Sequence, residues 1–357
     1  MEFNYTTENN ETLYEYKDID YWLKQFGSFW ELDSVYLLLL GPLAFTGSIL
    51  NFISFLALSQ KNLDKSNFFN YFKYISLNAF LINLFEAFLF IGCSHRYVPI
   101  SNTYGAMFYG NYFYLPITST LNFYGSILDI LINLERLSCF KTWIKSFFRY
   151  PARYVCMVAF ISCLIINSPY FLINEPGVFD APISNSTYFR IYYWAITDYS
   201  QTLTGKTLNY VVYFIKDVLT FIVEISISFT SIVLFKKFLK LKIGINPVGN
   251  VRKGQIKFSK KERKLTFMVI MISCVTFLAH SVYVTSVVYY FYSYDIIANT
   301  LGALGEIAVM FKNFLYFSFL YRFNLSFRNQ VKCMVLVVLN RLNLFFSKFI
   351  CPKCSSN

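Results

Sequence analysis

The stretch Thr118–Leu137, TSTLNFYGSILDILINLERL, decides the fold of this chain. Its apolar residues predict one helix, and that helix ends abruptly in the charged pair Glu135-Arg136. A basic segment follows, with Lys141, Lys145, Arg149 and Arg153. A carboxylate beside a guanidinium at the end of an apolar helix indicates a membrane boundary, and packing alone does not explain it.

The composition places the chain in a lipid bilayer. It is 56% hydrophobic and 15% charged, with a mean hydropathy of +0.44, whereas soluble proteins are about one quarter charged. A spanning helix needs about 20 mostly apolar residues. Seven such stretches are present: Ser34–Ser59, Tyr71–Cys93, Met107–Leu134, Val155–Ile173, Leu208–Phe235, Leu265–Phe291 and Leu301–Tyr321. We therefore expect an all-α, seven-transmembrane helix bundle over residues 34–321, between an N-terminal tail (1–33) and a C-terminal segment (322–357).

The distribution of Lys and Arg predicts the orientation, because basic loops stay on the cytoplasmic side of a membrane. The segment after the fifth span is strongly basic: Lys236, Lys237, Lys240, Lys242, Arg252, Lys253, Lys257, Lys260, Lys261, Arg263 and Lys264. The first 33 residues are acidic instead. We expect a multi-pass plasma-membrane protein with its N-terminus extracellular. The net charge of +12 then indicates topology and attraction to anionic lipid, and nucleic-acid binding is not needed to explain it.

Modification signals agree with this topology. Asn4, Asn10 and Asn185 each begin an Asn-x-Ser/Thr tripeptide in a segment expected outside, where glycosylation occurs. Cys351 and Cys354 lie beside basic and aromatic residues in the C-terminal tail. This pair is a candidate for lipidation, and an inert tail is the alternative.

Together the seven spans, the outside N-terminus, Glu135-Arg136 and Lys261-Glu262-Arg263-Lys264 before span six resemble the rhodopsin-like G-protein-coupled receptors. The resemblance covers most of residues 34–335. It implies a heterotrimeric G protein as the cytoplasmic partner, an extracellular ligand and no cofactor. It also implies that Arg136 acts as a switch, paired with Glu135 and, across the bundle, with Glu262. The alternative is that the pair merely marks the membrane boundary.

The chain departs from the family's pattern at several places, as a divergent member similar to invertebrate peptide or chemosensory receptors would. The family's Asn-Pro-x-x-Tyr is represented only by Asn313, and Leu137 stands where Tyr usually follows the Arg. Residues 324–328 resemble the start of the family's short eighth helix, and the apolar run that follows is too short to span. We expect this amphipathic helix to lie in the membrane interface.

Ionisable residues inside spans are functional candidates, because an unpaired charge there is unfavourable by several kcal/mol. Those expected toward the outer half form a predicted ligand pocket: Glu86, Lys216, Asp217 and Glu306. Thr118 joins them; it stands where amine receptors carry an Asp, so a cationic amine would lack its usual counter-ion at this position. Asp129 lies seven residues before Arg136 and is expected to tune the switch. The remaining ionisable residues are Glu224, His280 and Lys312; structural ion pairs between helices are the alternative for the whole set.

The sequence therefore predicts a receptor for a peptide or a small chemosensory molecule, and a transporter or channel is the alternative. An enzyme is not expected. Iron-binding membrane enzymes need many His, and this chain has two. Its glycines do not form a phosphate-binding loop, and no metal site is predicted.

Overall fold

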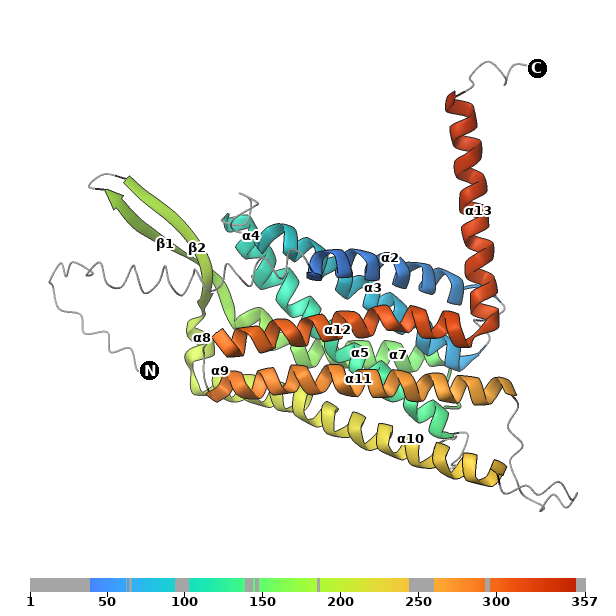
Figure 1. Cartoon of the computed structure of the whole chain (residues 1–357). Coiled ribbons are helices and arrows are strands. Elements are labelled where there is room, and N and C mark those ends of the chain that lie inside the picture. Colours follow the sequence, from blue (N-terminus) through green and yellow to red (C-terminus); the bar gives the residue numbers. More distant parts are fainter. Residues whose placement is uncertain are drawn as a thin grey trace, which may run out of the picture.

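The computed structural model describes residues 39–61, 63, 66–93, 103–138, 144, 148–184, 187–243, 260–292 and 296–350. Long helices lie side by side and form a bundle (Figure 1). The longer α-helices are α2 (Gly41–Leu58), α3 (Asn67–Cys93), α5 (Leu115–Ser138), α7 (Ala152–Asn167), α9 (Leu203–Tyr213), α10 (Thr220–Ile243), α11 (Lys260–Tyr292), α12 (Ile296–Phe323) and α13 (Leu325–Ile350). Shorter helical segments are α4 (Tyr104–Tyr109), η3 (Gly110–Tyr114), η4 (Ser168–Leu172), α8 (Asp198–Gln201) and η5 (Phe214–Leu219).

Within the described residues, six helices are long and apolar enough to cross a membrane: Gly41–Leu58, Tyr104–Ser138, Ala152–Leu172, Leu203–Lys236, Lys264–Ser286 and Thr300–Phe323. The all-α, membrane-embedded character expected from the sequence is thus confirmed. Helix α3 stands at the place of the expected second span but is not among the six. The side chains of its last residues, 88–93, lie outside what the structure describes, and the search for spans covered the described residues alone.

The bundle is more polar inside than on parts of its outer surface. Asn51, Asn83 and Asn133 are at most 6% exposed, whereas Val158 and Ile165 on α7 are more than 60% exposed. In water such an arrangement would be unfavourable, because apolar side chains would face the solvent. A surrounding bilayer makes it favourable.

Helix α5 is the central element, since it contacts α3, α7, α10 and α11. The largest buried cluster includes Leu128 and Ile132 of α5, Phe72 of α3 and Met268 of α11. These helices form one packed unit, so polar side chains on α5 lie close to three or more neighbouring helices.

A β-hairpin follows η4 and was not predicted from the sequence. Strands β1 (Asn174–Ser184) and β2 (Thr187–Ile196) pair antiparallel, with Asn174 opposite Ile196. The hairpin extends from one end of the bundle, and α13 begins at the other, where α5 also ends (Figure 1). We call these the hairpin end and the Arg136 end.

Helix α13 follows α12 at the place where a short amphipathic eighth helix was expected. Helix α13 has 26 residues and runs across the direction of α12 instead of continuing it (Figure 1). Asn324 separates the two helices and caps α13, since its Oδ1 accepts a hydrogen bond from the Phe327 N–H at 3.1 Å. The predicted modification sites Asn4, Asn10, Asn185, Cys351 and Cys354 lie outside the described residues.

Candidate functional site

Two π-helical segments stand beside a polar cavity between the helices. In η5 the chain makes a wider turn, and the Thr220 hydroxyl correspondingly donates to the carbonyl oxygen of Ile215, five residues earlier, at 3.2 Å. Lys216 and Asp217 lie within this segment and both line the cavity. The second segment, η3, ends at Tyr114, which also lines it. Such π-helical turns occur frequently at functional sites.

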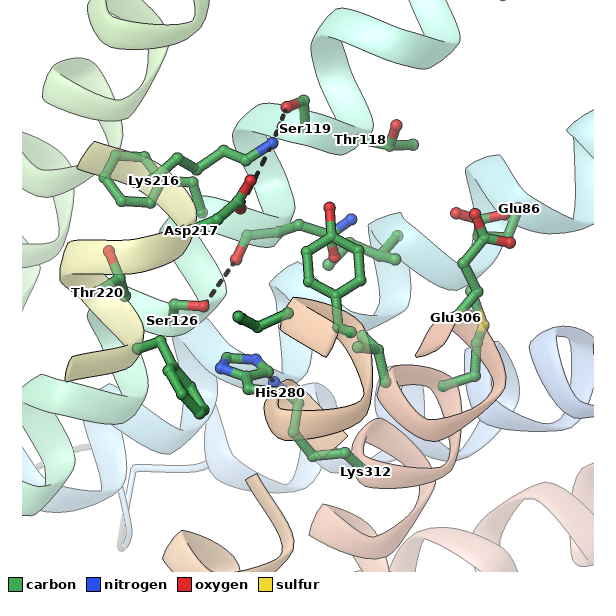
Figure 2. A pocket seen from close by; sticks show the side chains of 18 of the residues that line it. Glu86, Thr118, Ser119, Ser126, Lys216, Asp217, Thr220, His280, Glu306 and Lys312 are labelled. Atoms are coloured by element: carbon green, nitrogen blue, oxygen red, sulfur yellow. Dashed lines mark hydrogen bonds and ion pairs between the residues drawn. The ribbon is translucent and has the colours of Figure 1, made fainter. Parts of the chain in front are cut away.

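The cavity has a volume of about 220 Å³. It lies between helices α3, α5, α10, α11 and α12, toward the hairpin end (Figure 2). All five residues predicted to form a ligand pocket line it: Glu86, Thr118, Lys216, Asp217 and Glu306. The structure therefore brings the predicted set together, and their binding of a ligand stays a prediction.

Lys216 is held on one wall of the cavity. Its ammonium donates to Ser119 Oγ at 3.1 Å and to the Tyr170 hydroxyl at 3.4 Å, and it lies 3.8 Å from Asp217 Oδ1 (Figure 2). The side chain of Asp217 is only 7% exposed. Its second oxygen, Oδ2, has no hydrogen-bond partner within the part of the chain that the structure describes.

Two carboxyl groups meet on another wall. Glu86 of α3 and Glu306 of α12 point toward each other (Figure 2) and lie close enough to interact electrostatically. Glu86 also accepts a hydrogen bond from Tyr114. The Thr118 hydroxyl donates a hydrogen bond to the backbone carbonyl oxygen of Tyr114, four residues earlier, at 2.7 Å.

A buried ion pair closes the floor of the cavity. Lys312 lines the cavity, and its Nζ lies 3.3 Å from Asp129 Oδ2. The Tyr316 hydroxyl lies 2.6 Å and 2.7 Å from the two Asp129 oxygens and donates to this carboxylate. Helices α5 and α12 are thus joined by charged groups at the middle of the bundle.

His280 extends this ion pair to two further helices. Its Nε2 lies 3.4 Å from Lys312 Nζ, and its Nδ1 lies 2.5 Å from Glu224 Oε2. The result is a chain of ionisable groups from α10 through α11 and α12 to α5. Ion pairs between helices, the alternative weighed for these residues, are therefore present here.

A polar ladder continues from Asp129 along α5 toward the Arg136 end. Asn133 Nδ2 donates to the Asp129 carbonyl oxygen at 3.0 Å, and the Ser273 hydroxyl of α11 donates to Asn133 Oδ1 at 2.5 Å. Ser273 and His280 are seven residues apart on α11, so they share a face. Helix α11 thus contacts both the ionic chain and the ladder.

Arg136 lies at the end of this ladder. Its guanidinium is 3.1 Å from Glu135 Oε2, and its Cζ lies 3.5 Å from the centre of the Phe68 ring. Both charged side chains are largely buried, at 11% and 17% exposure. The predicted second partner, Glu262, has a side chain outside what the structure describes.

Asn313, the residue retained from the family's span-seven motif, is buried at 4% exposure. Its carbonyl oxygen accepts a hydrogen bond from Asn51 Nδ2 at 3.3 Å, which joins α12 to α2. Among the described residues no three His, Cys, Asp or Glu side chains are grouped to hold a metal ion.

No protein-family model and no curated protein sequence matches this chain. The case for a function therefore comes from the cavity, the ionic chain and the ladder.

Sequence reasoning missed the partners that connect the ionisable residues. It had not assigned roles to Tyr316, Asn133, Ser273 or Ser119, whose contacts were given above. The available signal was weak: polar residues stand at helical spacing on α5 at Asp129, Asn133 and Arg136. That spacing identifies a polar face but does not identify what it meets.

Proposed function

We propose that this chain is a membrane receptor that couples ligand binding in the polar cavity to a heterotrimeric G protein at the Arg136 end. In this proposal α3 also crosses the membrane, as the second of seven spans. The hairpin end is extracellular, the Arg136 end is cytoplasmic, and the protein resides in the plasma membrane. Asn4, Asn10 and Asn185 are then exposed to glycosylation, and Cys351 and Cys354 to lipidation, while α13 lies along the inner membrane interface.

One observation carries the proposal: a series of polar contacts leads from the cavity to Asn133 on α5, one helical turn before Arg136. It begins at His280 and Lys312, which line the cavity. It continues through Asp129 and Asn133 on α5, and Arg136 follows Asn133 by three residues. A ligand that displaces a group at the cavity floor therefore changes a contact that holds α5.

Helix α11 is the element that such a change would move. It is attached to α12 and α10 through His280 and to α5 through Ser273. A ligand that favours an arrangement without these contacts shifts the population toward it. A complete shift from 1:99 to 99:1 needs about 5.5 kcal/mol of differential binding.

Arg136 is placed to act at the receiving end. Its guanidinium is held by Glu135 and Phe68, and a charge at the hydrocarbon edge requires such partners. Movement of α11 away from α5 would expose this region to a cytoplasmic protein. The predicted ion pair between Arg136 and Glu262 would also break when α11 moves away from α5, because Glu262 lies in α11.

The experiment measures nucleotide exchange on purified G proteins of each major class by the full chain in lipid nanodiscs. We expect exchange above that of empty nanodiscs, and we expect Arg136→Ala to abolish it. Arg153→Ala is the matched control, because Arg153 is exposed and its guanidinium lies against the exposed Tyr154 ring. Exchange that Arg136→Ala leaves intact would contradict the proposal.

A transporter is the second candidate, and the ionic chain favours it. Alternating acidic, basic and His groups across four helices are what proton relays in membranes use. Proton or ion flux into liposomes that contain the purified chain and no G protein would support this reading. The same liposomes without flux, together with nucleotide exchange, would support the receptor.

A further inference from the structure

The cavity and its floor bring together five acidic and three basic side chains. Three carboxylates in and below it each have a basic partner: Asp129 with Lys312 at 3.3 Å, Glu224 with His280 at 2.5 Å, and Asp217 with Lys216 at 3.8 Å. Both lysines that line the cavity are engaged in this way. Glu86 and Glu306 bring two further carboxyl groups to the same cavity.

The arrangement of Glu86 and Glu306 favours a cation between them. They come from different helices, α3 and α12, and point toward each other at the cavity wall (Figure 2). Two carboxyl groups at short range in a low-dielectric site repel each other when both are ionised, so together they favour holding one proton. A positive group placed between them would turn this repulsion into two attractions.

Asp217 provides a second, independent indication of a ligand. Its side chain is 7% exposed and lines the same cavity, yet Oδ2 has no hydrogen-bond partner among the described residues. Buried polar atoms normally have a partner. A donor on the ligand would supply it, on the wall across the cavity from Glu86 (Figure 2).

We propose that the cavity binds a cationic group, an ammonium or a guanidinium, between Glu86 and Glu306, with a donor of the same ligand at Asp217 Oδ2. This proposal rests on the proposed receptor function for its physiological meaning. A volume of about 220 Å³ is below the range of about 300–1,000 Å³ typical of drug-sized ligands. The cation is therefore a small amine or one basic side chain of a peptide. Thr118 supplies no counter-ion, but α3 and α12 supply two.

The test uses the purified full chain in nanodiscs, without a G protein, and four probes. Benzylammonium and a capped Ala-Arg-Ala peptide are the cations, benzyl alcohol is the neutral analogue, and benzoate is the anion. A probe that binds the folded chain raises its Tm, and isothermal titration gives the affinity. We expect a rise with at least one cation and none with benzyl alcohol or benzoate.

Substitutions locate the effect. Glu86→Gln and Glu306→Gln should each weaken cation binding by at least about tenfold, because each removes one partner of a buried charge. Asp198→Asn is the control, since Asp198 is an exposed acid near the hairpin end. Glu306→Lys should raise the Tm of the ligand-free chain and eliminate the cation's effect, because its ammonium fills the site beside Glu86.

Benzylammonium binding identifies a free amine as sufficient, and binding of the peptide alone identifies a basic side chain. An equal Tm rise with benzyl alcohol, no rise with either cation, or cation binding that survives both Gln variants would overturn the proposal. Cation binding without nucleotide exchange on any G protein would remove the receptor function and leave this site. Nucleotide exchange without cation binding would remove this site and leave the receptor function.

Discussion

Lys312 Nζ lies 3.3 Å from Asp129 Oδ2, with the two side chains only 6% and 4% exposed. This contact ties α12 to α5 directly beneath the cavity. Breaking a buried ion pair by removing one partner is strongly unfavourable, whereas removing both partners is often nearly neutral. The pair is therefore a connection that a ligand can disturb and that mutations can dissect.

Lys312→Met should destabilise the chain by about 3–5 kcal/mol, because it leaves the Asp129 carboxylate buried without its cation. Adding Asp129→Asn should restore most of the lost stability, since the amide still accepts a hydrogen bond from Tyr316 and carries no charge. Thermal unfolding of the purified variants measures both effects. A double variant no more stable than Lys312→Met would contradict this pairing.

Ser273→Ala should destabilise the chain by about 1 kcal/mol, the usual contribution of one hydrogen bond. The substitution removes the contact between α11 and Asn133 of α5. Ser281→Ala on the same helix is the control, because the Ser281 hydroxyl donates to the Phe277 carbonyl oxygen of its own helix. Equal losses of Tm in the two variants would argue against a special role for Ser273.

Phe68→Leu should lower stability more than Phe69→Leu does, by about 0.5–2 kcal/mol, the range of a cation–π contact. Both rings are buried, at 2% and 7% exposure, but only Phe68 lies under the Arg136 guanidinium. Measuring the unfolding of both variants in the Arg136→Ala background completes a double-mutant cycle. In that background the difference in stability between them should vanish. A difference that persists without Arg136 would refute the stacking contribution.

Gly47→Ala and Gly302→Ala should act in opposite directions. A Cβ at Gly47 would lie 2.5 Å from Asn83 Nδ2, whereas a Cβ at Gly302 would meet nothing within 4 Å. The first substitution displaces the buried Asn83 amide, which fills the space between α2 and α3 at this point. The second should stabilise α12 by up to about 1 kcal/mol, because Ala favours helix over Gly. Thermal unfolding of both variants tests the close packing of α2 against α3, which a tolerated Gly47→Ala would contradict.

The sequence predicted the helices and the residues around the cavity because both follow from hydropathy. Runs of about 20 apolar residues can satisfy their backbone in lipid only as helices or closed barrels. Charged residues within such runs must turn inward, which is why Glu86, Lys216, Asp217 and Glu306 gather at one cavity.

The partners of those residues could not be predicted in the same way. The pairing of Lys312 with Asp129 depends on how α12 rotates against α5, and hydropathy does not specify this rotation. The π-helical turn at η5 changes the helical phase near Asp217 without an obvious signal in the sequence. The β-hairpin was not predicted, although Tyr, Phe, Ile and Trp, which favour strands, are common in β2.

The most direct test of the coupling between the cavity and the Arg136 end is nucleotide exchange by the Asp129→Asn, Lys312→Met double variant in nanodiscs. This variant lacks the charged tie between α5 and α12 and is expected to fold. Its basal nucleotide exchange on a G protein should exceed that of the unaltered chain, and adding Arg136→Ala should abolish this exchange. Unchanged exchange by the folded double variant, or raised exchange that persists without Arg136, would contradict this coupling.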